Sequence, residues 1–180
     1  MQKPWVSKQT GFTIVELLIV MVIIGILAAI TVVAYNGVQD RARTAKMKSD
    51  VALLTKAAMA ARIANGSTLI NVTGSNATAG SCAGKPTGTD LAALPTSDSC
   101  WTSYASALSK ISTLSGINVN NMVDPWGRPY LIDENEGEGS PTNCTKDTLA
   151  AFTQPFVSGW TPYSATPGNN VSVSGFTGCS

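Results

Sequence analysis

The chain has 180 residues, of which 13% are charged, and its net charge is +1. Such sparse charge lacks the basic stripe typical of nucleic-acid-binding proteins, so we expect no nucleic-acid partner. Histidine is absent, which excludes histidine-based acid–base catalysis and histidine ligands for a metal. Since no serine–lysine motif is recognisable either, we predict that the protein is not an enzyme.

The N-terminal third of the sequence predicts one long helix. Residues 1–11 are polar and contain Lys3 and Lys8 but no acidic residue. An apolar run follows from Phe12 to Tyr35, and at about 1.5 Å per residue it is long enough to cross the ~30 Å hydrocarbon core of a bilayer. We therefore divide the predicted helix Phe12–Asn65 into a transmembrane half, residues 12–35, and a second half.

The second half, residues 36–65, has an amphipathic pattern, so only this half can pack on a soluble domain. Asn65 and Gly66 provide a stop signal, because glycine readily adopts the left-handed conformation. The apolar residues recurring at spacings of three and four are Val38, Ala42, Ala45, Val51, Leu54, Ala58 and Ala61.

Residues 66–180 are predicted to form a soluble globular domain. Residues 66–89 are rich in Gly, Ser, Thr and Asn, which predicts a linker, and we expect a short strand at Leu69–Val72. A brief helical turn is expected at Leu91–Leu94, and a second helix at Tyr104–Ser115 that Gly116 can cap.

The C-terminal part of this domain is predicted to contain strands. We expect them at Arg128–Asp133, Ala151–Val157 and Asn170–Phe176, although Pro155 would confine the middle strand to a sheet edge. The predicted fold class is α+β, with the long N-terminal helix packed on a small antiparallel sheet.

The cysteines Cys82, Cys100, Cys144 and Cys179 all follow the apolar run. An even number in this position predicts two disulfides formed in an oxidising compartment, and four cysteines allow three pairings. We favour Cys82–Cys100 and Cys144–Cys179, because each closes a short or terminal loop. A zinc site is disfavoured, since no C-x-x-C motif occurs.

Glu16 is unexpected near the start of an apolar run, where a charge is costly and is a functional candidate by default. The string TGFTIVE places Glu16 as the fifth residue from Phe12, just after Gly11. This spacing, followed by LLIVMVIIGILAAI, closely resembles the class III prepilin signal, with its N-terminal methylation motif, of type IV pilins and pseudopilins. The resemblance covers about Lys8 to Arg43 in detail.

This resemblance implies a structural subunit of a type IV pilus or related filament. The leader, residues 1–11, would be removed after Gly11 by a prepilin peptidase, Phe12 would be methylated on its new amine, and Glu16 would serve assembly. The precursor would cross the cytoplasmic membrane once, then join copies of itself and other pilins in an extracellular filament through inner-membrane assembly machinery. A pseudopilin of a type II secretion or DNA-uptake system is the alternative within the family.

Two other interpretations of the N-terminus remain open. An ordinary secretory signal could be cleaved at Val32-Val33-Ala34 and release a secreted binding domain, or the run could be a simple anchor. Both leave Glu16 unexplained. The sequence departs from the family in lacking the proline that many members carry in this neighbourhood, so only Gly25 and Gly37 weaken the helix.

The string DPWGRPY, Asp124–Tyr130, resembles a segment of the major pseudopilins of type II secretion, in which a calcium site lies in the following loop. The corresponding residues here are Asp133, Glu134 and Glu136, which offer the oxygen ligands that calcium prefers. The alternative is a solvated acidic turn, with Trp126 and Tyr130 packed in the core.

Overall fold

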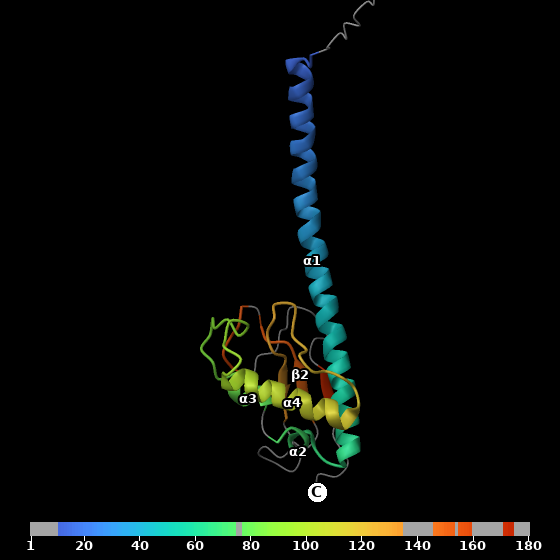
Figure 1. The fold of residues 1–180 in the computed structure, drawn as a ribbon, viewed down its shortest axis with the longest axis vertical. Coiled ribbons are helices and arrows are strands. Elements are labelled where there is room, and N and C mark those ends of the chain that lie inside the picture. Colours follow the sequence, from blue (N-terminus) through green and yellow to red (C-terminus); the bar gives the residue numbers. More distant parts are fainter. Residues whose placement is uncertain (1–10, 75–76, 135–145, 154, 160–170, 175–180) are drawn as a thin grey trace, which may run out of the picture. The chain divides into compact units, whose positions relative to one another are not determined.

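The computed structural model describes residues 11–74, 77–134, 146–153, 155–159 and 171–174, without the side chains of 32–36, 146 and 171–174. The chain divides into two compact units, Met1–Ala42 and Arg43–Ser180. Along the chain the elements are α1 (Ile14–Asn65), α2 (Leu69–Thr73), α3 (Ala77–Ser81), α4 (Ser99–Ser115), β1 (Leu131–Asp133), β2 (Lys146–Ala150) and β3 (Val171–Ser174) (Figure 1).

The described part of the first unit is the beginning of α1, and it is apolar on all sides. Every large apolar side chain from Phe12 to Ile30 is more than half exposed. The stretch Ile14–Thr31 is long and apolar enough to cross a membrane, and none of it is buried within the chain. A helix with no polar face needs lipid or other apolar helices around it, because water would otherwise solvate this surface at a large cost.

In the second unit, the rest of α1 buries one stripe of side chains. Residues recurring at three and four positions, Met47, Val51, Leu54, Ala58 and Ala61, are at most 1% exposed. They form a hydrophobic cluster together with residues of α2, α4, β1 and β2. The predicted apolar stripe is therefore confirmed from Met47 onward, whereas Val38, Ala42 and Ala45, which we placed in it, are exposed.

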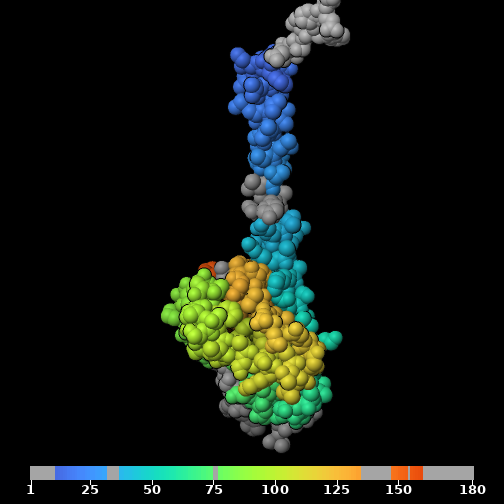
Figure 2. All heavy atoms as spheres, viewed as in Figure 1, coloured from blue at the N-terminus to red at the C-terminus, as the bar shows by residue number. Residues whose placement is uncertain are grey.

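The sheet of the second unit is antiparallel, with the strand order β1-β2-β3. Leu131 pairs with Ala150 in one ladder, and Lys146 pairs with Ser174 in the other. The predicted α+β class, a long helix with a small antiparallel sheet, is confirmed. In Figures 1 and 2 the loop between α3 and α4 lies at one edge of this unit, and α1 lies at the other.

The predictions of a linker over residues 66–89 and of a strand at Leu69–Val72 are wrong. This segment contains α2 and α3, and Leu69 and Val72, three residues apart, are buried on the same side of α2. Gly74 ends α2 with a φ of 84°, a left-handed conformation that glycine adopts at little cost. A segment rich in small polar residues thus forms two short helices, because tertiary contacts bury the few apolar side chains that it contains.

The second predicted helix is present but begins earlier, at Ser99. The Asp98 side chain accepts a hydrogen bond from the Cys100 amide nitrogen at 2.8 Å and caps the first turn. Gly116 ends the helix in the left-handed conformation, as predicted. Residues 91–93 form a turn rather than a helix, with the Ala93 amide bonded to the Asp90 carbonyl oxygen.

Of the predicted strands, Arg128–Asp133 and Asn170–Phe176 contain the shorter strands β1 and β3. The prediction of a strand at Ala151–Val157 is wrong, because the strand β2 ends at Ala150. Phe152 and Phe156 instead turn inward and stack edge to face at 5.5 Å between ring centroids. Both rings pack in a second hydrophobic cluster, which also contains Ala79, Cys82, Ala83, Leu91, Cys100, Leu131 and Ala150.

The disulfide Cys82–Cys100 is present and joins the end of α3 to the start of α4. Both cysteines are fully buried in the second hydrophobic cluster. The prediction of Cys144–Cys179 falls outside the described residues.

Candidate functional site

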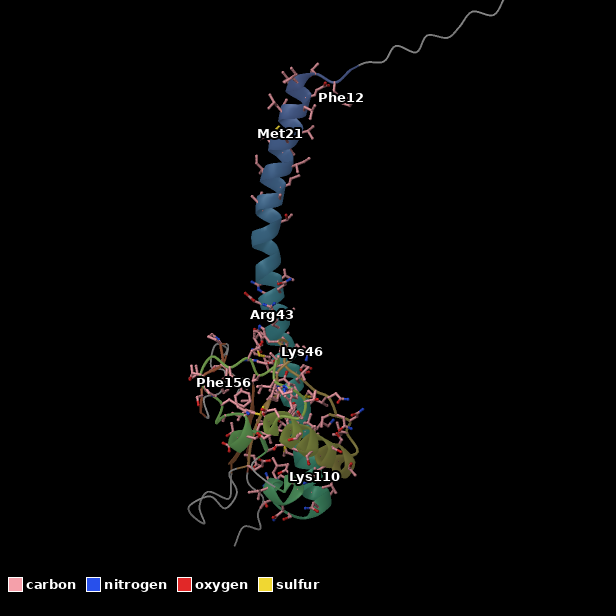
Figure 3. All side chains as sticks on the ribbon, turned by 60° about the vertical axis from the view of Figure 1, so that its left-hand side comes forward. Phe12, Met21, Arg43, Lys46, Lys110 and Phe156 are labelled. Carbon is pink, nitrogen blue, oxygen red and sulfur yellow. A yellow bond between two sulfur atoms is a disulfide. The ribbon has the colours of Figure 1, made fainter. Side chains whose placement is uncertain are left out.

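Gly11 and Phe12 lie in a short non-helical segment directly before α1. Both residues are exposed, and a side-chain atom added at Gly11 would meet nothing within 4 Å. The predicted cleavage point, the peptide bond between them, therefore lies outside any helix and is open to a protease. In Figure 3 the side chain of Phe12 projects from the chain at the start of the helix.

Glu16 takes part in a capping box at the start of α1. Its Oε2 atom accepts hydrogen bonds from the amide nitrogen and the hydroxyl of Thr13, each at 2.9 Å. The Thr13 hydroxyl oxygen in turn accepts a bond from the Glu16 amide at 3.2 Å. Because the first amides of a helix lack partners within it, these reciprocal bonds stabilise the first turn.

The capping box was missed in the sequence, although a signal for it was present. Thr13 and Glu16 match the pattern of Ser or Thr followed three positions later by Glu or Gln, just ahead of an apolar run. The sequence-based interpretation assigned Glu16 to assembly. The structure gives this carboxylate a local role that is independent of any neighbouring subunit.

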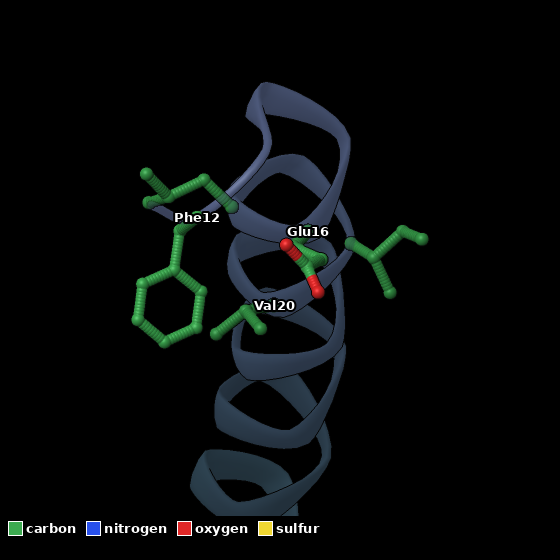
Figure 4. Close-up of a pocket in the computed structure, with 5 residues that line it drawn as sticks. Phe12, Glu16 and Val20 are labelled. Carbon is green, nitrogen blue, oxygen red and sulfur yellow. The ribbon is translucent and has the colours of Figure 1, made fainter. Parts of the chain in front are cut away.

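Phe12, Glu16 and Val20 project from one side of the first turns of α1, spaced by four residues (Figure 4). With Leu17 and Ile19 they line a surface depression that is almost entirely apolar. Thr13 provides all the hydrogen bonds of the Glu16 carboxylate within the described residues. A carboxylate on an apolar surface thus retains acceptor capacity for a cation that the described chain does not supply.

The DPWGRPY segment forms a tightly bonded turn in the second unit. The Asp124 carboxylate accepts bonds from the amides of Trp126 and Arg128, at 2.9 and 2.8 Å, and pairs with the Arg128 guanidinium at 2.7 Å. That guanidinium also donates to the carbonyl oxygens of Phe152 and Thr153. Because both charges are buried, this pair fixes the turn against the chain that follows β2.

Trp126 and Tyr130 confirm part of the alternative interpretation of this segment. Trp126 is half-buried, and the guanidinium carbons of Arg43 and Arg128 lie 5.9 and 5.0 Å from its ring centroid. Tyr130 is fully buried, and its hydroxyl donates to the Asp50 carboxylate at 2.6 Å. Side chains of this motif therefore connect α1 to the sheet.

The expected calcium ligands are only partly within the described residues, since Glu136 lies outside them. Asp133 and Glu134 are buried at the end of β1, so the alternative of a solvated acidic turn is wrong for these two residues. Glu134 Oε2 accepts a bond from the Ala77 amide at 3.0 Å, so this carboxylate already fixes the start of α3. Within the described residues, no group of three acidic, cysteine or histidine side chains is arranged to hold a metal.

Burial changes the proton affinity of Glu134. Loss of solvation raises the pKa of its carboxyl group to about 7, although the bonds from Thr73 and Ala77 act in the opposite direction. This group therefore titrates near neutral pH, where it determines whether a full charge lies between β1 and α3.

The comparisons with known proteins assign only the N-terminus. Residues 6–32 match the family described as the prokaryotic N-terminal methylation motif. No curated protein and no solved structure matches the chain. The matched segment contains the exposed peptide bond before Phe12, the capping box of Glu16 and most of the apolar helix. The chain therefore carries the class III prepilin signal of the type IV pilin and pseudopilin family.

Proposed function

We propose that this protein is a structural subunit of a type IV pilus or related filament. It is inserted in the cytoplasmic membrane as a single-pass precursor, with residues 12–35 in the bilayer. A prepilin peptidase removes residues 1–11, and Phe12 is methylated on its amine. The processed subunit then polymerises with copies of itself and other pilins at the inner-membrane assembly machinery.

The observation that carries this proposal is the combination of Glu16 with an apolar helix exposed on all sides. In the bilayer, lipid covers that surface, and in a filament the equivalent helices of neighbouring subunits would cover it. Cleavage after Gly11 creates a cationic amine in an apolar setting, where an unpaired charge is strongly disfavoured. Glu16, one helical turn away, supplies the matching anion, and pairing between neighbours would select the axial register of the subunits.

The mature N-terminus tests this proposal. We expect mass spectrometry of the surface-exposed protein to find chains that begin at N-methylated Phe12. Chains that begin at Tyr35 would show that an ordinary signal peptidase releases a secreted binding domain, and the filament proposal would then be wrong.

A pseudopilin role is the second candidate, favoured by the DPWGRPY segment and the carboxylates of Asp133 and Glu134 that follow it. In this role, calcium bound by these residues and Glu136 would stabilise the second unit. We expect millimolar calcium to raise the melting temperature of the processed protein, and Glu134→Gln to remove the increase. An unchanged melting temperature in calcium would count against the metal site.

A further inference from the structure

Most charged side chains described in the second unit are engaged inside that unit. The ion pairs are Lys46–Asp50, Arg62–Asp147, Lys85–Asp98 and Arg128–Asp124. Lys110 donates to the Thr73 carbonyl oxygen, and Arg43 lies over Trp126. Three exposed charged residues of the second unit have no such contact with an opposite charge or an aromatic ring in the part of it that the structure describes.

The three residues are Asp90, Lys48 and Lys56. The two lysines make no hydrogen bond or ion pair with any described residue, and Asp90 has no cationic partner among them. These three residues therefore have no counter-charge among the described residues.

Asp90 lines a pocket of about 370 Å³, which is large enough to receive a side chain. Trp126, Pro155 and Phe156 provide its apolar walls. Asp90 Oδ1 accepts a bond from the Ala92 amide at 3.0 Å, which leaves Oδ2 as an acceptor.

The other polar groups of this pocket also favour a ligand that donates hydrogen bonds. The Thr89 hydroxyl gives its proton to the Pro86 carbonyl oxygen at 2.7 Å, so its oxygen can only accept from a ligand. Arg128, in the wall, directs its donors to Asp124 and to the carbonyl oxygens that follow β2. An aliphatic stem that ends in an ammonium group suits such a pocket, because apolar walls cover the stem and a carboxylate meets the charge.

Lys48 and Lys56 lie on the exposed side of α1, away from the buried stripe that contains Met47, Val51 and Leu54. The loop that carries Asp90 lies at the opposite edge of the second unit from α1 (Figures 1 and 2). Two complementary patches on different faces of one subunit make a head-to-tail contact, and repeating such a contact produces an open helical array.

We propose that the pocket at Asp90 receives the ammonium group of Lys48 or Lys56 from a second copy of this chain. The inference rests on the proposed filament and adds a contact between soluble units to the contacts of the apolar helices. A symmetric dimer would pair identical patches, whereas this contact joins an acidic pocket to a basic helix face and extends along a filament.

Zero-length coupling tests the contact in native filaments. A carbodiimide converts the Asp90 carboxyl group to an O-acylisourea, and a lysine amine attacks the acyl carbon, forming an amide as the urea leaves. In filaments mixed from light and heavy-isotope subunits, we expect peptides that couple Asp90 of one mass to Lys48 or Lys56 of the other. Coupling of Asp90 only within a subunit, or only to a different protein, would overturn the proposal.

Charge reversal provides the second test. We expect Asp90→Lys, and the double change Lys48→Glu with Lys56→Glu, each to remove most filaments, and the combination of all three to restore them. Thr96→Lys is the matched control, because Thr96 is exposed in the same loop outside the pocket. Levels of processed, disulfide-bonded subunit in the membrane verify folding.

Two results separate this contact from the function on which it rests. Wild-type protein that never assembles, or whose mature chain begins at Tyr35, would remove the filament proposal and the contact with it. Wild-type filaments together with normal filaments from Asp90→Lys would overturn only the contact, and so would three reversals that fold but do not restore assembly.

Discussion

Replacing Glu16 separates the two roles that the structure and the proposed assembly give to its carboxylate. Glu16→Ala removes both the charge and the acceptor that bonds Thr13 at 2.9 Å. Glu16→Gln removes only the charge, because glutamine also serves at this position of a capping box. Thr13→Ala does the reverse: it removes the hydroxyl bonds and keeps the carboxylate.

The two effects differ in size. Loss of a helix cap costs about 0.5–2 kcal/mol, and only the first turn of a helix of 52 residues would fray. A cationic amine left without its partner between packed helices costs about 3–5 kcal/mol. At about 1.4 kcal/mol for each factor of ten, this is at least a 100-fold loss in the assembly constant for every subunit added.

We therefore expect both Glu16 variants to abolish surface filaments, while Thr13→Ala keeps filament yield within a few-fold of wild type. The assay compares filaments sheared from the cell surface with processed subunit in the membrane, and processing should persist in all three variants. Normal filaments from Glu16→Gln would show that capping alone accounts for Glu16, and the amine-pairing mechanism would then be wrong.

Three further predictions concern processing and stability. Gly11→Trp should block leader removal, because the peptidase must fit the backbone at the cut; normal gel mobility of this variant would contradict the class III assignment. Cys82→Ser with Cys100→Ser should lower the free energy of unfolding by about 2–4 kcal/mol, measured by chemical denaturation of the processed protein. In metal-free buffer, stability should fall as pH rises through about 7, because folding raises the pKa of Glu134 and the folded state then loses the proton it binds more tightly. That loss of unfolding free energy should be up to about 3 kcal/mol between pH 4.5 and pH 8, and Glu134→Gln should abolish it. If the unfolding free energy of this variant falls with pH as steeply as that of the wild type, another group titrates.

The N-terminal features could be predicted from sequence because they depend on local spacing. The apolar run, the stop at Gly66 and the position of Glu16 after Gly11 need no information from distant residues, since a helix satisfies its own backbone hydrogen bonds. The capping box of Thr13 and Glu16 is equally local, because Thr followed three residues later by Glu is a pattern visible in the sequence.

The short elements of the second unit could not be predicted in the same way. The segment Leu69–Val72 has strand-forming residues, but it is a helix because two of its side chains reach the core only at helical spacing. Similarly, Phe152 and Phe156 follow β2 and pack in the second hydrophobic cluster, and the Arg128 guanidinium binds the Phe152 carbonyl oxygen.

The sequence by itself determined that the chain carries a prepilin signal. Two local features carry this signal: an apolar helix without a polar face, and Glu16 five residues after Gly11. Only the tertiary structure decided which charges are satisfied internally. Ion pairs such as Arg62–Asp147 join residues far apart in the chain, so no spacing rule reveals them. Among the described residues of the second unit, Asp90, Lys48 and Lys56 are exposed and have no counter-charge, which no local spacing in the sequence indicates.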